Sequence, residues 1–335
     1  MIKFLKTLVI GTSLNDHSDA VVRSGVALAR SIGASPWLIH TYPPSLGVYG
    51  AGLDAPWIEE QVKILREQID EQAERTGLSA LAGFSRDQVC LVLGAPHREI
   101  VDLASRVDAG LIIVGVAEGR QGILGSTADR VIRKASCPVL AVRSEAAFPP
   151  TRVEIPLDFS PVALNALQQG MALLDQMGVA HPDAEVLFVL NPLEMGGSIH
   201  FDEEQIRRFS DEELHRVVQQ SLPASLRPRS VRVQTGYPRE EILARLAERQ
   251  ADLAVLGTHG RGGFERLVIG SVAEGVLRGA RCNLLVVPPA ASLRDDTATE
   301  SQEKRTDADW TYVSDEDSVV PAKVSSLNLD EYWFG

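Results

Sequence analysis

Short apolar runs rich in β-branched residues alternate with helix-like patterns along the first half of the chain. Polar or turn-forming residues flank each run, as expected for strands that are buried on both faces of a sheet. Between the runs, apolar residues recur every three or four positions, which is the spacing of one face of a helix. The expected strands are Leu8–Gly11, Trp37–His40, Val89–Leu93, Leu111–Gly115 and Val139–Val142. The helical patterns cover 21–29, 58–69, 100–104 and 128–132.

The second half of the chain repeats the first. "TLVIGTS" at 7–13 matches "RVEIPLD" at 152–158, and "RKASCPVLAVR" at 133–143 matches "LRGARCNLLVVP" at 277–288. The longest match joins "GAPHREIVDLASRVDAGLIIVG" (94–115) to "GYPREEILARLAERQADLAVLG" (236–257). A repeat of this length indicates two copies of one domain. The second copy's expected strands are Val153–Leu157, Val186–Leu190, Val231–Val233, Leu253–Gly257 and Leu284–Val287.

Strand–helix alternation over five strands predicts an open parallel sheet with helices on both of its faces. We therefore predict an α/β protein with two tandem doubly wound open sheets of five parallel strands each. Ligands of such sheets bind outside the carboxyl ends of the strands, near the point where the strand order reverses. The predicted domains are 1–147 and 148–290, followed by a tail at 291–335.

The tail differs in composition from the two domains. Residues 291–335 hold 11 acidic and 4 basic residues, and they carry more than half of the chain's net charge of −12. A polar, acidic segment of this kind is expected to be mostly disordered. Its last residues include Tyr332, Trp333 and Phe334, so docking of the aromatic end on a folded surface stays open as an alternative.

Charge and cysteine content exclude several classes of protein. An acidic chain with a pI near 5.1 argues against nucleic-acid binding, which needs a concentrated basic surface. We find no apolar stretch long enough to span a membrane, and the apolar start is too short for a signal peptide. Cys90, Cys137 and Cys282 form no CxxC pair. We therefore expect a cytoplasmic protein with reduced cysteines.

The segment with the clearest chemistry follows the fourth strand of the second copy. It reads "GTHGRGGFERLVIGSVAE" from Gly257 to Glu274, and Gly270–Ser271 opens the last expected helix. Glycines allow backbone to approach a ligand closely, and unpaired amides at a helix N-terminus attract phosphate. No Lys-Ser/Thr follows the glycines, so the segment is not a Walker A loop. The spacing Gly-x2-Gly-x9-Gly-Ser instead predicts a different phosphate site.

This spacing resembles the ATP-binding signature of the universal stress protein family. Three other landmarks fit a tandem form of that family: a first strand ending in Asp158, a second ending near "LFVLNP", and a Gly-x-Pro at Gly236–Pro238. The resemblance implies an adenine-nucleotide alpha hydrolase-like or flavodoxin-like three-layer sandwich. It also implies pairing of the two halves in one chain through Val139–Val142 and Leu284–Val287, with a homodimer possible.

The resemblance further implies which residues hold the nucleotide, which would be ATP, ADP or AMP. Pro156, Leu157 and Asp158 would line the adenine and ribose region, and Val189 would touch the base. Gly257, His259 and Gly260 would contact ribose and the α-phosphate. Gly270, Ser271, Val272 and Ala273 would hold the β- and γ-phosphates.

Two of these roles have structural alternatives. Asp158 is a candidate Mg²⁺ ligand, because hard cations on phosphates prefer carboxylate and water oxygens. It could instead cap the following helix, a role that Ser160 could also fill. His259 could be a solvent-facing loop residue, and we expect it to act through its backbone and not through its imidazole.

The first copy departs from the pattern. Its loop between Gly115 and Gly125 is three residues shorter, Glu118 stands where the second glycine should be, and Ser13 replaces the aspartate. A carboxylate about 4–6 Å from a phosphate weakens binding. We therefore expect the first copy not to bind ATP in the family's manner, although Gly125–Ser126 keeps a helix start that could hold an anion.

The function expected first is that of a stress-response regulator that binds ATP in its C-terminal domain. The alternatives are a slow ATPase or phosphotransferase, and a nucleotide-independent scaffold that uses the acidic tail. The segment from Gly257 to Glu274 contains no base–nucleophile pair and no loop lysine, so it would hold ATP without strongly stabilising a transition state. We name no catalytic residue.

Overall fold

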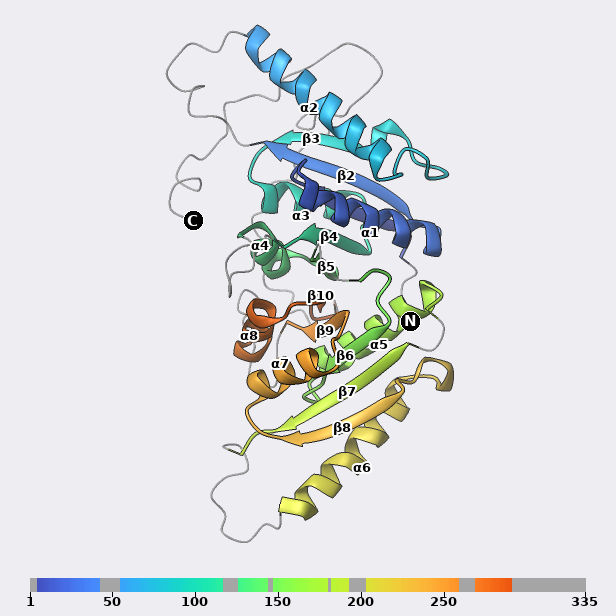
Figure 1. The fold of residues 1–335 in the computed structure, drawn as a ribbon, viewed down its shortest axis with the longest axis vertical. Helices are drawn as coiled ribbons and strands as arrows, with labels where there is room; N and C mark the ends of the chain where they lie inside the picture. Colours follow the sequence, from blue (N-terminus) through green and yellow to red (C-terminus); the bar gives the residue numbers. More distant parts are fainter. Residues whose placement is uncertain are drawn as a thin grey trace.

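The structure is a computed structural model, and it describes residues 5–42, 55–116, 126–143, 147–179, 182–192, 203–258 and 269–290. Two α/β units follow one another in the chain (Figure 1). The strands of the first unit are β1 (Thr7–Thr12), β2 (Ser35–Tyr42), β3 (Val89–Leu93), β4 (Leu111–Gly115) and β5 (Val139–Val142). Its helices are α1 (Asp16–Ile32), α2 (Ala55–Arg75), α3 (Pro96–Arg106) and α4 (Ser126–Lys134), with a 3-10 turn at Arg86–Gln88.

The second unit has the same succession of elements. Its strands are β6 (Arg152–Pro156), β7 (Asp183–Leu190), β8 (Ser230–Thr235), β9 (Leu253–Gly257) and β10 (Asn283–Val287). Its helices are α5 (Pro161–Gln176), α6 (Glu203–Ser221), α7 (Pro238–Glu248) and α8 (Ser271–Gly279), with a 3-10 turn at Ala224–Leu226. The two parallel five-stranded sheets predicted from the sequence are therefore confirmed.

The two sheets join into one. The strand order is β3-β2-β1-β4-β5-β10-β9-β6-β7-β8, so each unit has its own strands in the order 3-2-1-4-5. The junction is antiparallel, with Leu284 opposite Ala141 and Leu285 opposite Leu140. This is the pairing of the two halves that the family resemblance implied, and it makes one mixed ten-stranded sheet.

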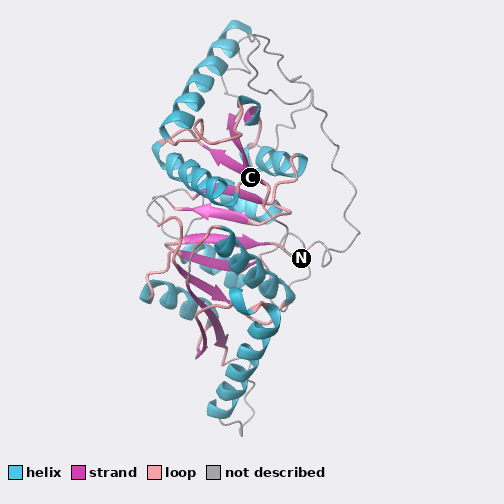
Figure 2. Cartoon of the chain, turned by 90° about the vertical axis from the view of Figure 1, so that its right-hand side faces the viewer, coloured by secondary structure: helices cyan, strands magenta, loops and turns pink. Residues whose placement is uncertain are grey.

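Helices cover both faces of this sheet, as the rotated view shows (Figure 2). One apolar cluster lies beneath α1, α2, α5 and α6, and it runs without a break from Leu140 of β5 to Leu285 of β10. A second cluster lies beneath α3, α4, α7 and α8, and Ala141 and Leu284 link its halves. Because both clusters cross the junction, the two units share one continuous core on each face. None of the helices in the described part of the chain is long and apolar enough to cross a membrane.

Candidate nucleotide site

The predicted site lies at the carboxyl ends of β6 and β9, where the strand order of the second unit reverses. The chain runs outward from β6 through β7 to β8, and then crosses to β9 on the other side of β6. Register pairs between β6 and β9 are Val153 with Leu253 and Glu154 with Ala254, near the start of both strands. Open α/β sheets bind ligands outside the carboxyl ends of the strands at such a reversal.

The glycine-rich segment is anchored at both of its ends. Thr258 donates its amide to the Val287 carbonyl at 3.2 Å, and its own carbonyl accepts the Gly270 amide at 2.9 Å. This second bond brings the end of β9 next to the start of α8. The segment between them, 259–268, lies outside the described residues, and so do two of the predicted site residues, His259 and Gly260.

Helix α8 begins where the sequence predicted. Gly270 is its N-cap residue and has no side chain with which to cap, and the first intrahelical bond runs from the Glu274 amide to the Gly270 carbonyl at 2.8 Å. The amides of Ser271, Val272 and Ala273 therefore have no acceptor within the helix. The side chains of Ser271 and Val272 are exposed, whereas Ala273 is buried. This helix start can hold an anion through backbone amides and the Ser271 hydroxyl.

Asp158 follows β6 directly and shapes the turn into α5. Its Oδ1 accepts the Ser160 amide at 3.0 Å, while the Ser160 hydroxyl oxygen accepts the Ala163 amide at 3.2 Å and caps the helix. Phe159 between them has a φ of 61°, in the left-handed region. The cap role thus belongs to Ser160, and Asp158 holds the turn that precedes it.

The side chains of the other predicted site residues differ in their exposure to solvent. Pro156 and Val189 are partly buried, and Val189 packs on the cluster beneath α7 and α8. Leu157 is only 3% exposed and donates its amide to the Leu187 carbonyl at 2.9 Å. The Leu157 side chain is therefore part of the core, so it would support a ligand from below.

Gly257 has a packing role that the sequence did not reveal. A Cβ at this position would lie 3.0 Å from Val162 Cγ1, 3.2 Å from the Val162 carbonyl carbon and 3.3 Å from the Ala163 nitrogen. Two of these atoms belong to the backbone of α5 and cannot rotate away. The end of β9 therefore lies so close to the first turn of α5 that a side chain at position 257 would require the two elements to move slightly apart.

The described residues offer little for a metal ion on their own. No group of three or more His, Cys, Asp or Glu side chains within the described ranges could hold one. Asp158 is a single carboxylate at the edge of the site. This fits Mg²⁺ that is bound mainly by phosphate and water oxygens, with one protein carboxylate.

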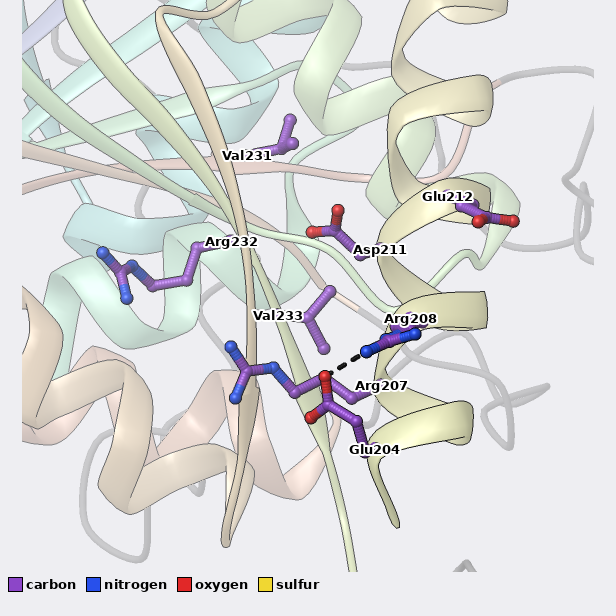
Figure 3. A pocket seen from close by; sticks show the side chains of 8 residues that line it. All are labelled: Glu204, Arg207, Arg208, Asp211, Glu212, Val231, Arg232 and Val233. Carbon is purple, nitrogen blue, oxygen red and sulfur yellow. Dashed lines mark hydrogen bonds and ion pairs between the residues drawn. The ribbon is translucent and has the colours of Figure 1, made fainter. Parts of the chain in front are cut away.

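A hollow of about 400 Å³ lies away from this site, between α6 and β8 at the outer edge of the sheet. Figure 3 shows Arg208 bonded to Glu204 there, a bond of 3.2 Å, and Val231 and Val233 of β8 line the same hollow. Both members of this ion pair are more than half exposed. Solvent screens such pairs, so this ion pair contributes little to stability.

Sequence reasoning missed a group of charged side chains inside the second unit. Arg249 Nη1 lies 2.8 Å from Glu154 Oε2, and Arg245 Nε lies 2.7 Å from Glu185 Oε1. Burial raises the pKa of Glu154 to about 7, against the opposing effect of Arg249. Burial alone would also raise the pKa of Glu185, but the hydrogen bonds and positive charge of Arg245 outweigh burial, so the pKa of this carboxyl group is lowered. The sequence signal that could have revealed this group is a glutamate inside each of two apolar strands, Glu154 in β6 and Glu185 in β7.

The corresponding end of the first unit is built differently. The Gln72 amide oxygen accepts from the Thr12 hydroxyl at 2.6 Å, and its nitrogen donates to Ser18 at 3.0 Å and to Asp19 at 2.7 Å. Burial lowers the pKa of His40, whose Nδ1 lies 2.9 Å from the Thr12 carbonyl oxygen. Residues 117–125, with Glu118 and Gly125, lie outside the described residues.

Comparisons with known proteins match this architecture. A universal stress protein of Mycobacterium tuberculosis is 26% identical over 310 residues, which cover 83% of this chain and 96% of the relative. One from Thermus aquaticus is 31% identical over 141 residues, 41% of this chain and 98% of the relative. The crystal structure of a universal stress protein from Archaeoglobus fulgidus has a TM-score of 0.61 at 19% identity. It covers 87% of this chain and 100% of that one.

The family model settles the assignment for both halves of the chain. The model described as "Universal stress protein family" matches residues 5–143 and again residues 151–288. Each match coincides with one five-stranded unit, and together they take in the described strands. The chain therefore belongs to the universal stress protein family, as a tandem of two family domains.

Proposed function

We propose that this stress-response protein binds an adenine nucleotide in its C-terminal domain and that the bound nucleotide sets its conformation or assembly. The observation that carries the proposal is the hydrogen bond between the Gly270 amide and the Thr258 carbonyl. It holds the start of α8 against the end of β9, so that the free amides of the helix and the Asp158 turn share one edge of the sheet.

The chemistry of this edge supports a phosphate ligand. The amides of Ser271, Val272 and Ala273 would hold the β- and γ-phosphates, where the helix dipole favours negative charge. Gly257 and Gly260, with His259, would adjoin the ribose and α-phosphate. Pro156, Leu157, Asp158 and Val189 would line the base and ribose. Mg²⁺ would supply charge neutralisation of the phosphates, with Asp158 as its protein ligand.

The first domain would not bind ATP in the same way. It has a shorter loop with Glu118 in place of the second glycine and Ser13 in place of the aspartate. Its described part supports this difference, because a polar network fills the end of β1 where the second domain has Leu157. Its role would be to pair with the second domain.

Calorimetric titration of ATP with Mg²⁺ into the full chain tests the proposal. We expect one site per chain, abolished by Gly270→Val with Ser271→Ala. The matched control is Gly125→Val with Ser126→Ala at the start of α4, which should leave binding unchanged. Two sites of similar affinity would contradict the assignment to one domain, and no site at all would refute the proposal. Phosphate release above background would indicate a slow ATPase instead of a binding protein.

A further inference from the structure

Four charged side chains meet beneath α7, on the side of the sheet away from α5 and α6. Glu154 and Glu185 are register partners on β6 and β7, so the two carboxyl groups lie on the same face of neighbouring strands. Glu154 is 0% exposed and Glu185 is 4% exposed. Arg245 and Arg249, one turn apart at the end of α7, each bond one of them. These groups make a buried ionic network.

The two carboxyl groups are unequally satisfied. Glu185 accepts two bonds from Arg245, at 2.7 and 3.1 Å, and one from the Ser230 hydroxyl at 3.0 Å. Glu154 receives Arg249 at Oε2, but its Oε1 is buried without a hydrogen-bond partner. A buried carboxylate oxygen that lacks a donor costs free energy, and a proton on that oxygen removes much of this cost.

The first domain shows that the fold does not need charges at these positions. The residues that correspond to Glu154, Arg245 and Arg249 in the repeat are Val9, Leu103 and Val107. All three pack in, or against, the apolar cluster on that face. Apolar replacement of a buried ion pair is often neutral or stabilising, so stability alone does not account for the network.

We propose that Glu154 binds and releases a proton inside the folded domain, so that the network is a proton-dependent clamp between α7 and the strands β6 and β7.

The charged groups that surround Glu154 come from three elements. From α7 come Arg245 and Arg249, which remain protonated at any physiological pH. From β7 come Asp183, whose Oδ2 lies 3.1 Å from Arg249, and Glu185. From the edge strand β8 comes Arg232, 3.4 Å from Glu185.

Another ion pair lies at the start of β6. Asp252 meets Arg152 there at 3.0 Å. Burial alone would raise the pKa of Asp252. The hydrogen bonds from the Arg152 side chain and from the backbone amides of Arg152 and Thr151 outweigh burial, so the pKa of this carboxyl group is lowered. Asp252 and Glu185 therefore stay ionised at neutral pH, and Glu154 is the carboxyl group of this set that changes state near neutrality.

The direction of the effect follows from the pKa of Glu154, which rises from 4.5 to about 7 on burial. Between these values the folded chain holds a proton that the unfolded chain has lost. Stability therefore falls as the pH rises through this range and levels off above it. The folded chain is therefore more stable, relative to the unfolded chain, in mild acid than in mild alkali.

Urea unfolding of the full chain between about pH 5 and about pH 8 tests the clamp. We expect the unfolding constant of the native protein to rise on the order of 100-fold over this range, and this rise to be missing in Glu154→Gln. Asp252→Asn is the matched control, because it removes another buried carboxylate of the same domain. Asp252→Asn should lower the stability of the protein throughout this pH range, and its unfolding constant should still rise with pH as in the native protein. An equal rise in Glu154→Gln would overturn the proposal.

A direct titration keeps the test decisive if Glu154→Gln fails to fold. Carboxyl carbons of the glutamates, labelled with carbon-13 in the native chain, report each proton by nuclear magnetic resonance. We expect one buried glutamate to titrate near pH 7. If every glutamate titrated below about pH 5.5, close to its ordinary value, Glu154 would be ionised throughout and the clamp would not exist.

Discussion

The hydrogen-bonded network around Gln72 in the first domain and the charged network around Glu154 in the second lie on opposite faces of the same sheet. In the first domain, Gln72, Thr12 and Ser18 bond one another beneath α1 and α2. In the second, Glu154 and Arg249 are bonded beneath α7. Several positions of each network are apolar in the other domain.

The repeat makes this exchange explicit. Thr12, Ser18 and Asp19 correspond to Leu157, Ala163 and Leu164, and Val9 and Val107 correspond to Glu154 and Arg249. The fold accepts polarity on either face if each buried group finds a partner. The face on which the polar groups lie therefore separates the two copies more clearly than their backbone does.

Breaking the charged network of the second domain should have the largest effect. Arg249→Leu leaves the Glu154 carboxyl group buried without its hydrogen-bonded cation and removes bonds to two carbonyl groups. We expect a loss of about 3–5 kcal/mol at pH 8, measured by urea unfolding. Glu154→Val with Arg249→Val copies the first domain and should cost less than Arg249→Leu alone. A larger cost for the double variant would mean that the two domains need different chemistry at this place.

Breaking the polar network of the first domain should have a smaller effect, because no buried charge loses its only partner. Gln72→Leu removes the bonds to Thr12, Ser18 and Asp19, while Arg75 still bonds Asp19 at 2.7 Å. We expect a loss of about 2–3 kcal/mol by urea unfolding. Arg86→Ala, at an exposed ion pair of the same domain, is the control and should change stability little. A loss equal to that of Arg249→Leu would show that the two networks are equivalent.

Comparison of two corresponding glycines should give the smallest effect. A Cβ at Gly257 would meet backbone atoms of α5, whereas among the described residues a Cβ at Gly115 would meet a side-chain atom, Val21 Cγ2, at 3.0 Å. We expect Gly257→Ala to cost about 1–3 kcal/mol and Gly115→Ala less, since a side chain can move aside. Thermal unfolding of the two variants checks the order. A larger loss of stability for Gly115→Ala than for Gly257→Ala would mean that β4 packs more tightly on α1 than β9 packs on α5.

Most of the fold could be predicted from the sequence, because apolar runs mark strands that are buried on both faces. Leu111–Gly115, Val139–Val142 and Leu253–Gly257 have the predicted bounds in the structure. The start of α8 at Ser271 was also accessible, since Gly-Ser marks a helix start. The strand order was not read from the pattern, because hydrophobicity along a strand does not specify its neighbours.

Less of the site could be predicted from the sequence, for a physical reason. Sequence spacing placed Asp158 and Gly270 at strand and helix ends, but it did not show that Ser160 caps α5 or that Gly257 packs on its backbone. Such roles depend on contacts between elements far apart in the chain. The partners of Glu154 remained hidden for the same reason, because register brings Glu185 beside it and the crossover of α7 brings Arg249.

The antiparallel contact between β5 and β10 has a consequence for how the halves evolve and behave in solution. Two separate domains would associate according to their concentration, and each could pair with its own kind. In one chain, the partner is always present at an effective concentration of about millimolar or more. Dilution cannot part the halves, and each always meets the other in a fixed one-to-one ratio. One half is thus free to lose a binding activity while its partner retains it.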